Sequence, residues 1–227
     1  MNPRPRKLRL LRWMPDRWIA TRGPGGAPTL HLTFDDGPHP EHTPRLLDLL
    51  AEHGATATFF VIGREAERHP ALVQRMVAEG HRLGNHSWSH PQFDRIPLET
   101  QREEMARTDA LLQCHDGEPV HDWRTPRGVL PRPFVRDCIR QGRRIAFWSY
   151  DTLDYGRPPV ETLVAIARRH PPRAREILLM HDDSHESHGL LQAMLPEWRA
   201  RGFQLRALQP MDAEPRPDAA PSARGAA

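Results

Sequence analysis

Hydrophobic positions along this chain fall into short runs separated by longer amphipathic stretches. The short runs are rich in β-branched and aromatic residues, or alternate in polarity, which is typical of strands. They span residues 29–34, 56–62, 82–86, 121–125, 144–149, 176–181 and 203–208. Between them, apolar residues recur at helical spacing, which predicts helices near 43–54, 70–79, 97–114, 132–141, 159–169 and 188–201.

The regular alternation of strands and helices indicates the fold class. It predicts an α/β domain whose parallel strands are joined by right-handed crossovers. Seven such units are too many for a small open sheet, so we predict a distorted (β/α)7 barrel, closed or incomplete. This single domain is expected at residues 29–209, between a basic N-terminal arm at 1–28 and a disordered, Pro- and Ala-rich tail at 210–227.

The N-terminal arm mixes basic and apolar residues. Its cations are Arg4, Arg6, Lys7, Arg9, Arg12 and Arg17. The arm lacks the continuous apolar core of a signal peptide, and the chain has no run long enough to span a membrane. We favour an arm that is disordered or packed on the domain. The alternative is a short basic helix that lies on an anionic membrane surface.

Localisation and partners follow from the same features. Without an export signal, we expect a cytoplasmic protein, with the inner face of the membrane as a second possibility. Cys114 and Cys138 lie in predicted helices without metal-ligand spacing, so we expect two reduced thiols. The formal net charge is +3, but the arginines are scattered among acidic residues and no nucleic-acid-binding motif accompanies them. We therefore predict no nucleic-acid partner.

Polar motifs follow the carboxyl ends of five predicted strands. They are Asp35-Asp36, His86, Arg124, the pair Asp151 and Asp154, and His181-Asp182-Asp183. In a β/α barrel the carboxyl ends of all strands meet at one mouth, which is where active sites form. We therefore expect these side chains to share one site.

Two adjacent carboxylates, Asp35 and Asp36, end the first strand. Like charges that close cannot both stay ionised cheaply unless a cation lies beside them. Asp-Asp-Gly-Pro can also be an ordinary turn. A metal ion is the alternative, because His86 and His90 have the spacing of two imidazoles that converge from a tight loop or a helical turn. Asp36, His86 and His90 would then form a three-ligand set with open positions for water and substrate.

Six motifs, taken together, resemble one known family. They are TFDDGP at 33–38, ATFFVIG at 57–63, GNHSWSH at 84–90, WRTPRG at 123–128, WSYDTLDY at 148–155 and LLMHD at 178–182. The sequence is similar in these motifs, and in their order, to the polysaccharide deacetylases of carbohydrate esterase family 4. The resemblance covers residues 29 to about 208 and implies a barrel of the NodB-homology type.

The resemblance implies roles for the residues that match the motifs. Asp36, His86 and His90 would bind one divalent ion, zinc or else cobalt or another. Asp35 would be the general base that takes a proton from the metal-bound water. Arg124 would pair with Asp35 and hold it ionised and oriented.

The same resemblance implies a general acid and a substrate pocket. His181 would protonate the departing amine, Asp154 would hydrogen-bond His181, and Leu179 would line a pocket for the acetyl methyl. Three positions depart from the family pattern, and at the first of them Thr125 replaces a proline. Arg127 replaces an aromatic residue at the cleft, which suggests a negatively charged substrate, and Tyr155 replaces a tryptophan.

We therefore predict a metal-dependent hydrolase that removes the N-acetyl group from an amino sugar in an oligosaccharide, polysaccharide or lipid-linked glycan. The first alternative is a deformylase or amidase that acts on a lipid-linked sugar or small amide. A catalytically inactive glycan-binding module is disfavoured because Asp35 and His181 are both present. An iron oxygenase could use the same ligand set, but it would not explain the Arg124 and Asp154 partners.

Overall fold

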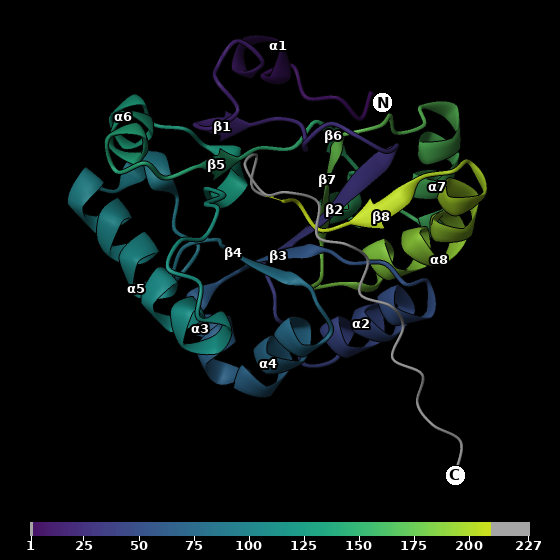
Figure 1. The fold of residues 1–227 in the computed structure, drawn as a ribbon, viewed down its shortest axis with the longest axis horizontal. Coiled ribbons are helices and arrows are strands. Elements are labelled where there is room, and N and C mark those ends of the chain that lie inside the picture. The colour runs from purple at the N-terminus through teal and green to yellow at the C-terminus, as the bar shows by residue number, and fades with distance from the viewer. Residues whose placement is uncertain (1, 210–227) are drawn as a thin grey trace.

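A sheet of parallel strands forms the centre of the molecule (Figure 1). The computed structural model of the chain describes residues 2–209. Within these residues the strand order is β4 (Arg82–Asn85), β3 (Thr58–Val61), β2 (Thr29–Asp35), β7 (Ile177–His181) and β6 (Tyr150–Asp151), and β8 (Gln204–Arg206) also pairs with β2. All these pairings are parallel, so the strands end at a common edge. This arrangement confirms the predicted α/β class.

Strand β2 is the organising strand because it pairs with three others. Its first half pairs with β8 and its second half with β3, while β7 runs along its other edge. All seven residues of β2 are buried, as expected for a strand covered on both faces. The register places Asp35 opposite His181 and Thr33 opposite Leu179.

The pairing continues around the far side of the sheet through shorter contacts. Trp123 forms single parallel bridges to Asn85 at the end of β4 and to Ile145 of β5 (Ile145–Ala146). The same segment then reaches β6, which pairs with β7. We call this arrangement of β2, β3, β4, β5, β6 and β7 the ring of strands. It is distorted, because single-residue bridges replace a regular ladder between β4 and β5.

Two strand predictions are wrong in detail. The predicted strand at 121–125 is reduced to the Trp123 bridges, because Pro126 follows closely and begins the turn η2 (Pro126–Gly128). The predicted strand at 144–149 is broken into β5 and β6 because the segment changes partners. The Phe147 N–H donates to Ala20, whereas the Ser149 N–H donates to Ile177.

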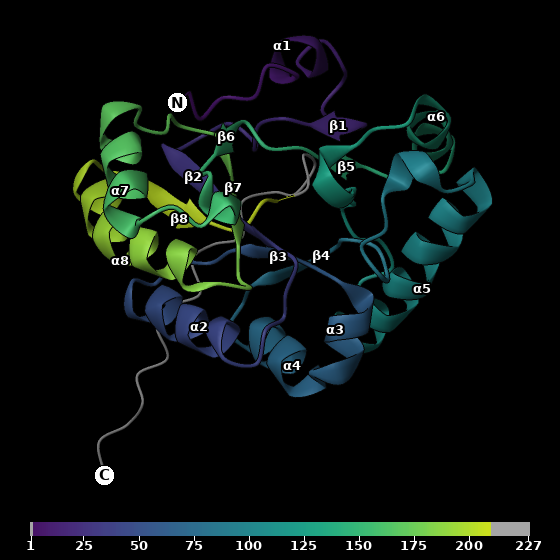
Figure 2. The same cartoon turned by 180° about the vertical axis from the view of Figure 1, so that it is seen from behind.

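Helices surround the strands on most sides (Figures 1 and 2). The six predicted helices are present as α2 (His42–Glu52), α4 (Pro70–Ala78), α5 (Leu98–Asp116), α6 (Arg132–Arg140), α7 (Val160–Arg169) and α8 (His185–Ala200). The helices α1 (Leu8–Leu11) and α3 (Gly63–Arg68) and the short turns η1 (Phe93–Arg95) and η3 (Asp154–Gly156) were not expected from the periodicity. Cys114 and Cys138 are free thiols, as expected.

The core follows from the two-residue period of the strands. Leu32, Phe34, Leu178 and Met180 belong to the main apolar cluster, together with Trp198 of α8. The alternate residues of β2 and β7 therefore point to the opposite face, which is the interior of the ring. That face carries the functional side chains described below.

The N-terminal arm packs on the domain and lies in the gap between α6 and α7 in the ring of helices (Figure 1). Its strand β1 (Ile19–Ala20) pairs in parallel with β5. Arg4 donates from Nε to the carboxylate of buried Glu176 over 2.8 Å, and the carbonyl of Pro3 accepts the Asp151 N–H. The arm is therefore packed on the domain, which is one of the two forms that the favoured interpretation allowed.

Two further expectations concern the ends of the chain and membranes. The tail predicted to be disordered, 210–227, lies outside the described residues. Among residues 2–209, no helix combines the length and the apolar character needed to cross a membrane.

The arm is expected to contribute to stability through Arg4. Replacing Arg4 with Ala leaves the Glu176 carboxylate buried without its cation. Removing one partner of a buried ion pair typically lowers the free energy of unfolding by about 3–5 kcal/mol. Because Arg4 keeps some access to water, we expect a loss of about 3 kcal/mol. Denaturant unfolding monitored by circular dichroism measures it. Arg6→Ala, which removes an exposed arginine of the same arm, should change stability by less than about 0.5 kcal/mol. Equal effects of the two variants would contradict this role for Arg4.

Candidate active site

The two adjacent carboxylates reach one site because the strand ends between them. Asp35 is the last residue of β2, and Asp36 has a left-handed backbone with φ of 77°. Neighbours in a strand point to opposite faces, and the left-handed turn ends that alternation. Both side chains therefore approach the same imidazole: His86 Nε2 lies 3.7 Å from Asp35 Oδ2 and 3.4 Å from Asp36 Oδ1.

The packing of Asp182 against this turn was not predicted from the sequence. A Cβ on Gly37 would lie 2.1 Å from the carboxylate oxygens of Asp182, so only glycine fits there. Asp182 is buried and accepts a hydrogen bond from the Thr43 hydroxyl over 2.6 Å. Burial raises the pKa of Asp182 to about 7. The position of Asp182 directly after His181 was the only sequence signal for this contact.

Asp36, His86 and His90 form a group that could hold a metal ion, with ligand atoms within 4.8 Å of one another. Asp36 Oδ1 lies 3.3 Å from His90 Nε2. His86 Nδ1 lies 2.8 Å from the carbonyl oxygen of Arg124, which can only accept. The neutral ring therefore carries its hydrogen on Nδ1 and presents the Nε2 lone pair toward Asp36.

The charge state of this group also suits a cation. Asp36 Oδ1 is buried and has no hydrogen-bond partner within residues 2–209. Burial raises the pKa of Asp36, but the nearby imidazoles of His86 and His90 outweigh it and the net shift is downward. Burial and the neighbouring His86 lower the pKa of His90. Burial lowers the pKa of His86, but the Asp35 and Asp36 carboxylates outweigh it and the net shift is upward, so a bound metal ion would replace a proton on Nε2. An ionised carboxylate with two imidazoles is the donor set that zinc and related divalent ions take.

The loop between the histidines sets their convergence. Residues 86–90 form no helix, and His90 has a left-handed backbone with φ of 56°. Asn85 holds the loop: its side-chain oxygen accepts the Ser87 N–H over 2.9 Å, and its amide donates to Asp109 over 2.7 Å. Of the two geometries considered for this spacing, the tight loop is present.

Asp35 and Arg124 form a fully buried ion pair. Arg124 Nη1 donates to Asp35 Oδ1 over 2.7 Å and to the Thr33 hydroxyl over 2.8 Å. The guanidinium also lies 4.0 Å from the centre of the Phe60 ring, and its Nε donates to the carbonyl of Ala146. Thr33 was missed by sequence reasoning, although its position two residues before Asp35 places it on the same strand face. The arrangement fixes the Asp35 carboxylate in one orientation.

His181 and Asp154 form a second pair on the other side of the site. His181 Nδ1 lies 3.0 Å from Asp154 Oδ1, and the backbone N–H of His181 donates to Asp154 Oδ2 over 2.7 Å. Burial lowers the pKa of His181, but the Asp154 carboxylate more than offsets this and raises it to about 10. The pair therefore favours the protonated form of the His181 ring.

The residues predicted to contact substrate lie around these pairs. Leu179 is buried on β7, on the same face as His181 and beneath it. The Tyr155 ring is 61% exposed and meets the His181 ring edge-on at 5.9 Å. Arg127 is exposed in η2 and has a left-handed backbone with φ of 55°.

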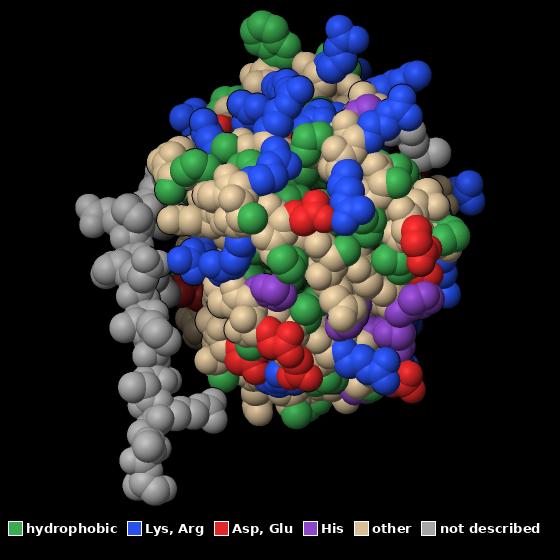
Figure 3. All heavy atoms as spheres, turned by 90° about the vertical axis from the view of Figure 1, so that its right-hand side faces the viewer, with side chains coloured by type: hydrophobic (Ala, Val, Ile, Leu, Met, Phe, Trp, Pro, Cys, Tyr) green, Lys and Arg blue, Asp and Glu red, His purple; other side chains and the backbone are tan. Residues whose placement is uncertain are grey.

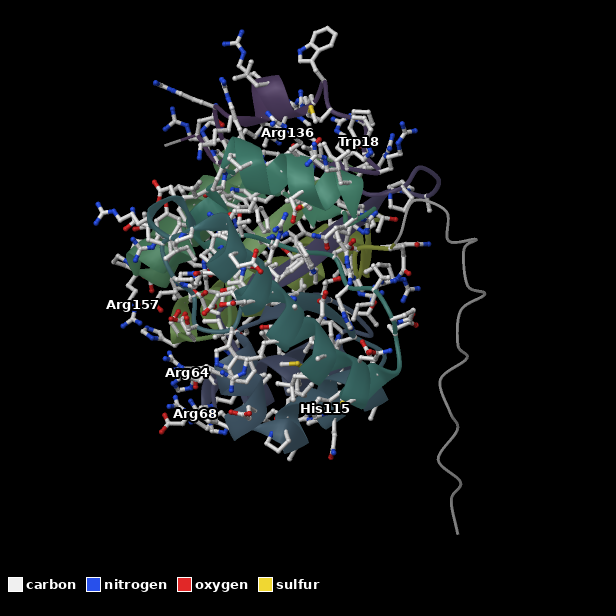
Figure 4. The ribbon with its side chains drawn as sticks, turned by 90° about the vertical axis from the view of Figure 1, so that its left-hand side faces the viewer. Trp18, Arg64, Arg68, His115, Arg136 and Arg157 are labelled. Carbon is white, nitrogen blue, oxygen red and sulfur yellow. The ribbon has the colours of Figure 1, made fainter. Side chains whose placement is uncertain are left out.

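A cleft of about 410 Å³ opens beside the candidate metal group. Asp36, Pro38, His39, Pro40, Ile62, Arg64, Glu65, Ser89, His90 and Asp183 line it. Arg64 and Arg157 project from the same side of the molecule (Figure 4). The cleft is thus open to solvent at the mouth of the ring, where an extended polar substrate could enter.

Comparison with known proteins identifies the family. The sequence profile described as polysaccharide deacetylase matches residues 22–145. The chain belongs to the polysaccharide deacetylase family. A chitooligosaccharide deacetylase of Sinorhizobium fredii is 33% identical over 197 residues, which are 81% of this chain and 91% of that protein. A peptidoglycan-N-acetylglucosamine deacetylase of Bacillus cereus is 35% identical over 66% of this chain and 57% of its own length.

Solved structures of polysaccharide deacetylases share the fold. The peptidoglycan N-acetylglucosamine deacetylase Bc1960 has a TM-score of 0.78 and 30% identity, over 84% of this chain and 90% of that one. Peptidoglycan deacetylase PdaC of Bacillus subtilis has a TM-score of 0.74 and 28% identity, over 81% and 89%. A mutant of the pseudoenzyme BA3943 with restored activity has a TM-score of 0.76 and 25% identity, over 84% and 69%. Because a pseudoenzyme has this fold, activity must be argued from side chains.

The candidate metal group gives a direct test. The protein is expected to bind one equivalent of zinc or cobalt, and His86→Ala should abolish that binding because the buried ligand is lost. Isothermal titration calorimetry with each metal measures the stoichiometry. His185→Ala is the matched control, since His185 is exposed and outside the group. Equal binding by the two variants would exclude this site.

Proposed function

We propose that this polysaccharide deacetylase family member is a divalent-metal-dependent hydrolase that removes the N-acetyl group from an amino sugar within a glycan. The observation that carries the proposal is the pair of buried couples, Asp35–Arg124 and His181–Asp154, on either side of the three-ligand group. Relatives named for chitooligosaccharide and peptidoglycan N-acetylglucosamine support the substrate class.

The metal proposed here is zinc, held by Asp36, His86 and His90, with cobalt or another divalent ion as the alternative. When bound, such an ion would make a coordinated water more acidic and polarise the amide carbonyl. The buried, unpartnered Asp36 oxygen supports a cation at this position. The His86 hydrogen bond to the Arg124 carbonyl would keep its ring turned toward the ion.

Asp35 is proposed as the general base. Its Oδ1 is engaged by Arg124, whereas its Oδ2 faces His86 and the candidate ligand group. The free oxygen is thus directed to where the attacking water would lie. Arg124 holds the carboxylate in the orientation in which its free oxygen would accept the proton.

His181 is proposed as the general acid. Amide hydrolysis requires a proton on the leaving nitrogen, and the raised pKa of His181 keeps its ring protonated at neutral pH. Asp154 orients the ring through Nδ1, which leaves Nε2–H free to donate.

Substrate selection is proposed to rest on three side chains. Leu179 would contact the acetyl methyl, and Tyr155 would present an aromatic face to a sugar ring. Arg127 replaces an aromatic residue at the cleft wall and would favour a glycan with a phosphate or carboxylate group.

The reaction itself is tested by acetate release. Purified protein with added zinc or cobalt is expected to release acetate from N-acetylglucosamine oligomers, phosphorylated N-acetyl sugars or lipid-linked acceptors, and a chelator should stop it. Asp35→Asn should lower kcat by at least about 10²- to 10⁴-fold and still bind the metal. Loss of metal by this variant would mean that the two aspartates have exchanged roles.

A lack of acetate release from every acceptor would contradict the proposal. Formate released from formylated analogues in place of acetate would favour the deformylase alternative.

The role of His181 predicts a shift in pH dependence. The raised pKa means that the acid stays protonated as pH rises, and Asp154→Asn removes the charge that raises it. The alkaline limb of the pH profile of kcat is therefore expected to move to lower pH, by about one to three pH units. Profiles of both proteins between pH 5 and 11 measure this. An unchanged alkaline limb, with only a uniform loss of rate, would contradict the assignment.

A further inference from the structure

The N-terminal arm has two apolar sides, and only one of them is used in packing. Leu8 is buried, and Leu11 and Met14 pack against the second apolar cluster of the domain. Leu10 and Trp13, also three residues apart, point away from the body and are 76% and 88% exposed. Large apolar side chains that are exposed close together can form a contact site for a protein or a membrane.

Cations surround these two residues. Arg6, Lys7, Arg9 and Arg12 are all exposed, and within residues 2–209 none of them forms an ion pair with a carboxylate. We call Arg6, Lys7, Arg9, Leu10, Arg12 and Trp13 the arm patch. Figure 3 shows Lys and Arg side chains gathered at the top of the view, where the arm lies, with apolar side chains among them. Figure 4 shows the same end of the molecule, with Arg136 of α6 beside it.

The arm patch is held firmly on the domain. The Arg4–Glu176 pair, the hydrogen bond from Asp151 to Pro3 and the pairing of β1 with β5 fix the arm on both sides of α1. Lys7 also donates to the carbonyl of Gly128, the residue after Arg127 in η2. The patch therefore has a fixed position next to the loop that carries Arg127.

We propose that the arm patch docks the protein on an anionic phospholipid bilayer. Exposed Trp and Leu side chains can enter the interfacial region, where indole rings are favoured, while the four cations meet the acidic headgroups. A polynucleotide would match the charge of the patch but would offer little to the Leu10 side chain. A bilayer matches both the charge and the apolar surface.

Docking would place the candidate active site beside the membrane. The contact between Lys7 and Gly128 links the patch to the Arg127 loop. A membrane-docked protein would thus have its cleft near glycans that are anchored to lipids. The docking itself goes beyond the proposed function and can be tested without any measure of activity.

Vesicle co-sedimentation of the full chain tests the proposal. The protein is expected to bind vesicles of phosphatidylglycerol and phosphatidylcholine and to stay in solution with phosphatidylcholine alone. The triple variant Arg6→Gln, Arg9→Gln, Arg12→Gln should bind on the order of a hundredfold more weakly. The double variant Leu10→Ser, Trp13→Ser should also bind more weakly. Its loss of vesicle affinity should persist at high salt, because the apolar contribution to binding is not screened.

Matched controls separate docking from net charge and folding. Arg45→Gln, Arg95→Gln, Arg201→Gln removes the same charge from exposed sites outside the arm, and Val120→Ser removes another exposed apolar residue. Both controls should bind vesicles like the unmodified protein, and circular dichroism checks that every variant is folded. No binding of the unmodified protein to anionic vesicles would overturn the proposal. So would equal losses in control and patch variants, or displacement from vesicles by DNA at low concentration.

Discussion

The candidate site depends on placing two neighbouring carboxylates, Asp35 and Asp36, next to one imidazole. In water-poor surroundings, two such charges repel, and one of them would take a proton unless cations lie close by. Arg124 supplies one cation, as it lies buried against Asp35 and is held by Thr33 and the carbonyl of Ala146. His86 and His90 form the other side, next to Asp36. The division of the pair into two different carboxylates follows from these different neighbours.

The ring of strands turns this local electrostatic arrangement into a site. The register of β2 with β7 brings His181 opposite Asp35, and Asp154 follows β6 on the next strand of the sheet. Trp123 bridges β4 and β5, which delivers the adjacent Arg124 beneath Asp35. Each couple therefore joins residues that are far apart in sequence but neighbours at the strand ends. A rigid sheet holds them more precisely than free loops could.

The N-terminal arm has a structural place in the same ring. It fills a side of the strands that carries no helix, and its β1 pairs with the short, bent segment that contains β5 and β6. The arm contacts Asp151 and Gly128, so it adjoins the segments that carry Asp154 and Arg124. Packing uses one apolar side of the arm and leaves the other side, with its cations, on the surface.

The sequence by itself determined the fold class, the family motifs and the identity of the polar side chains at the strand ends. These features are local, because strand and helix periodicity and turn residues act over a few neighbouring positions. The resemblance likewise singled out Asp35, Asp36, His86, His90, Arg124, Asp154 and His181, which the structure brings to one mouth. Leu179 is a strand residue whose face followed from the two-residue period.

Only the tertiary structure decided the remaining features. Thr33 beneath Arg124, the contact of Asp182 with Gly37 and Thr43, and the break between β5 and β6 all depend on partners distant in sequence. The arm is the clearest case, since its composition fitted a disordered segment, a packed one and a basic helix on a membrane surface. The tertiary structure pairs Arg4 with buried Glu176 and so packs the arm, because an isolated carboxylate is costly inside a protein, and no local pattern reveals which distant cation will lie beside it.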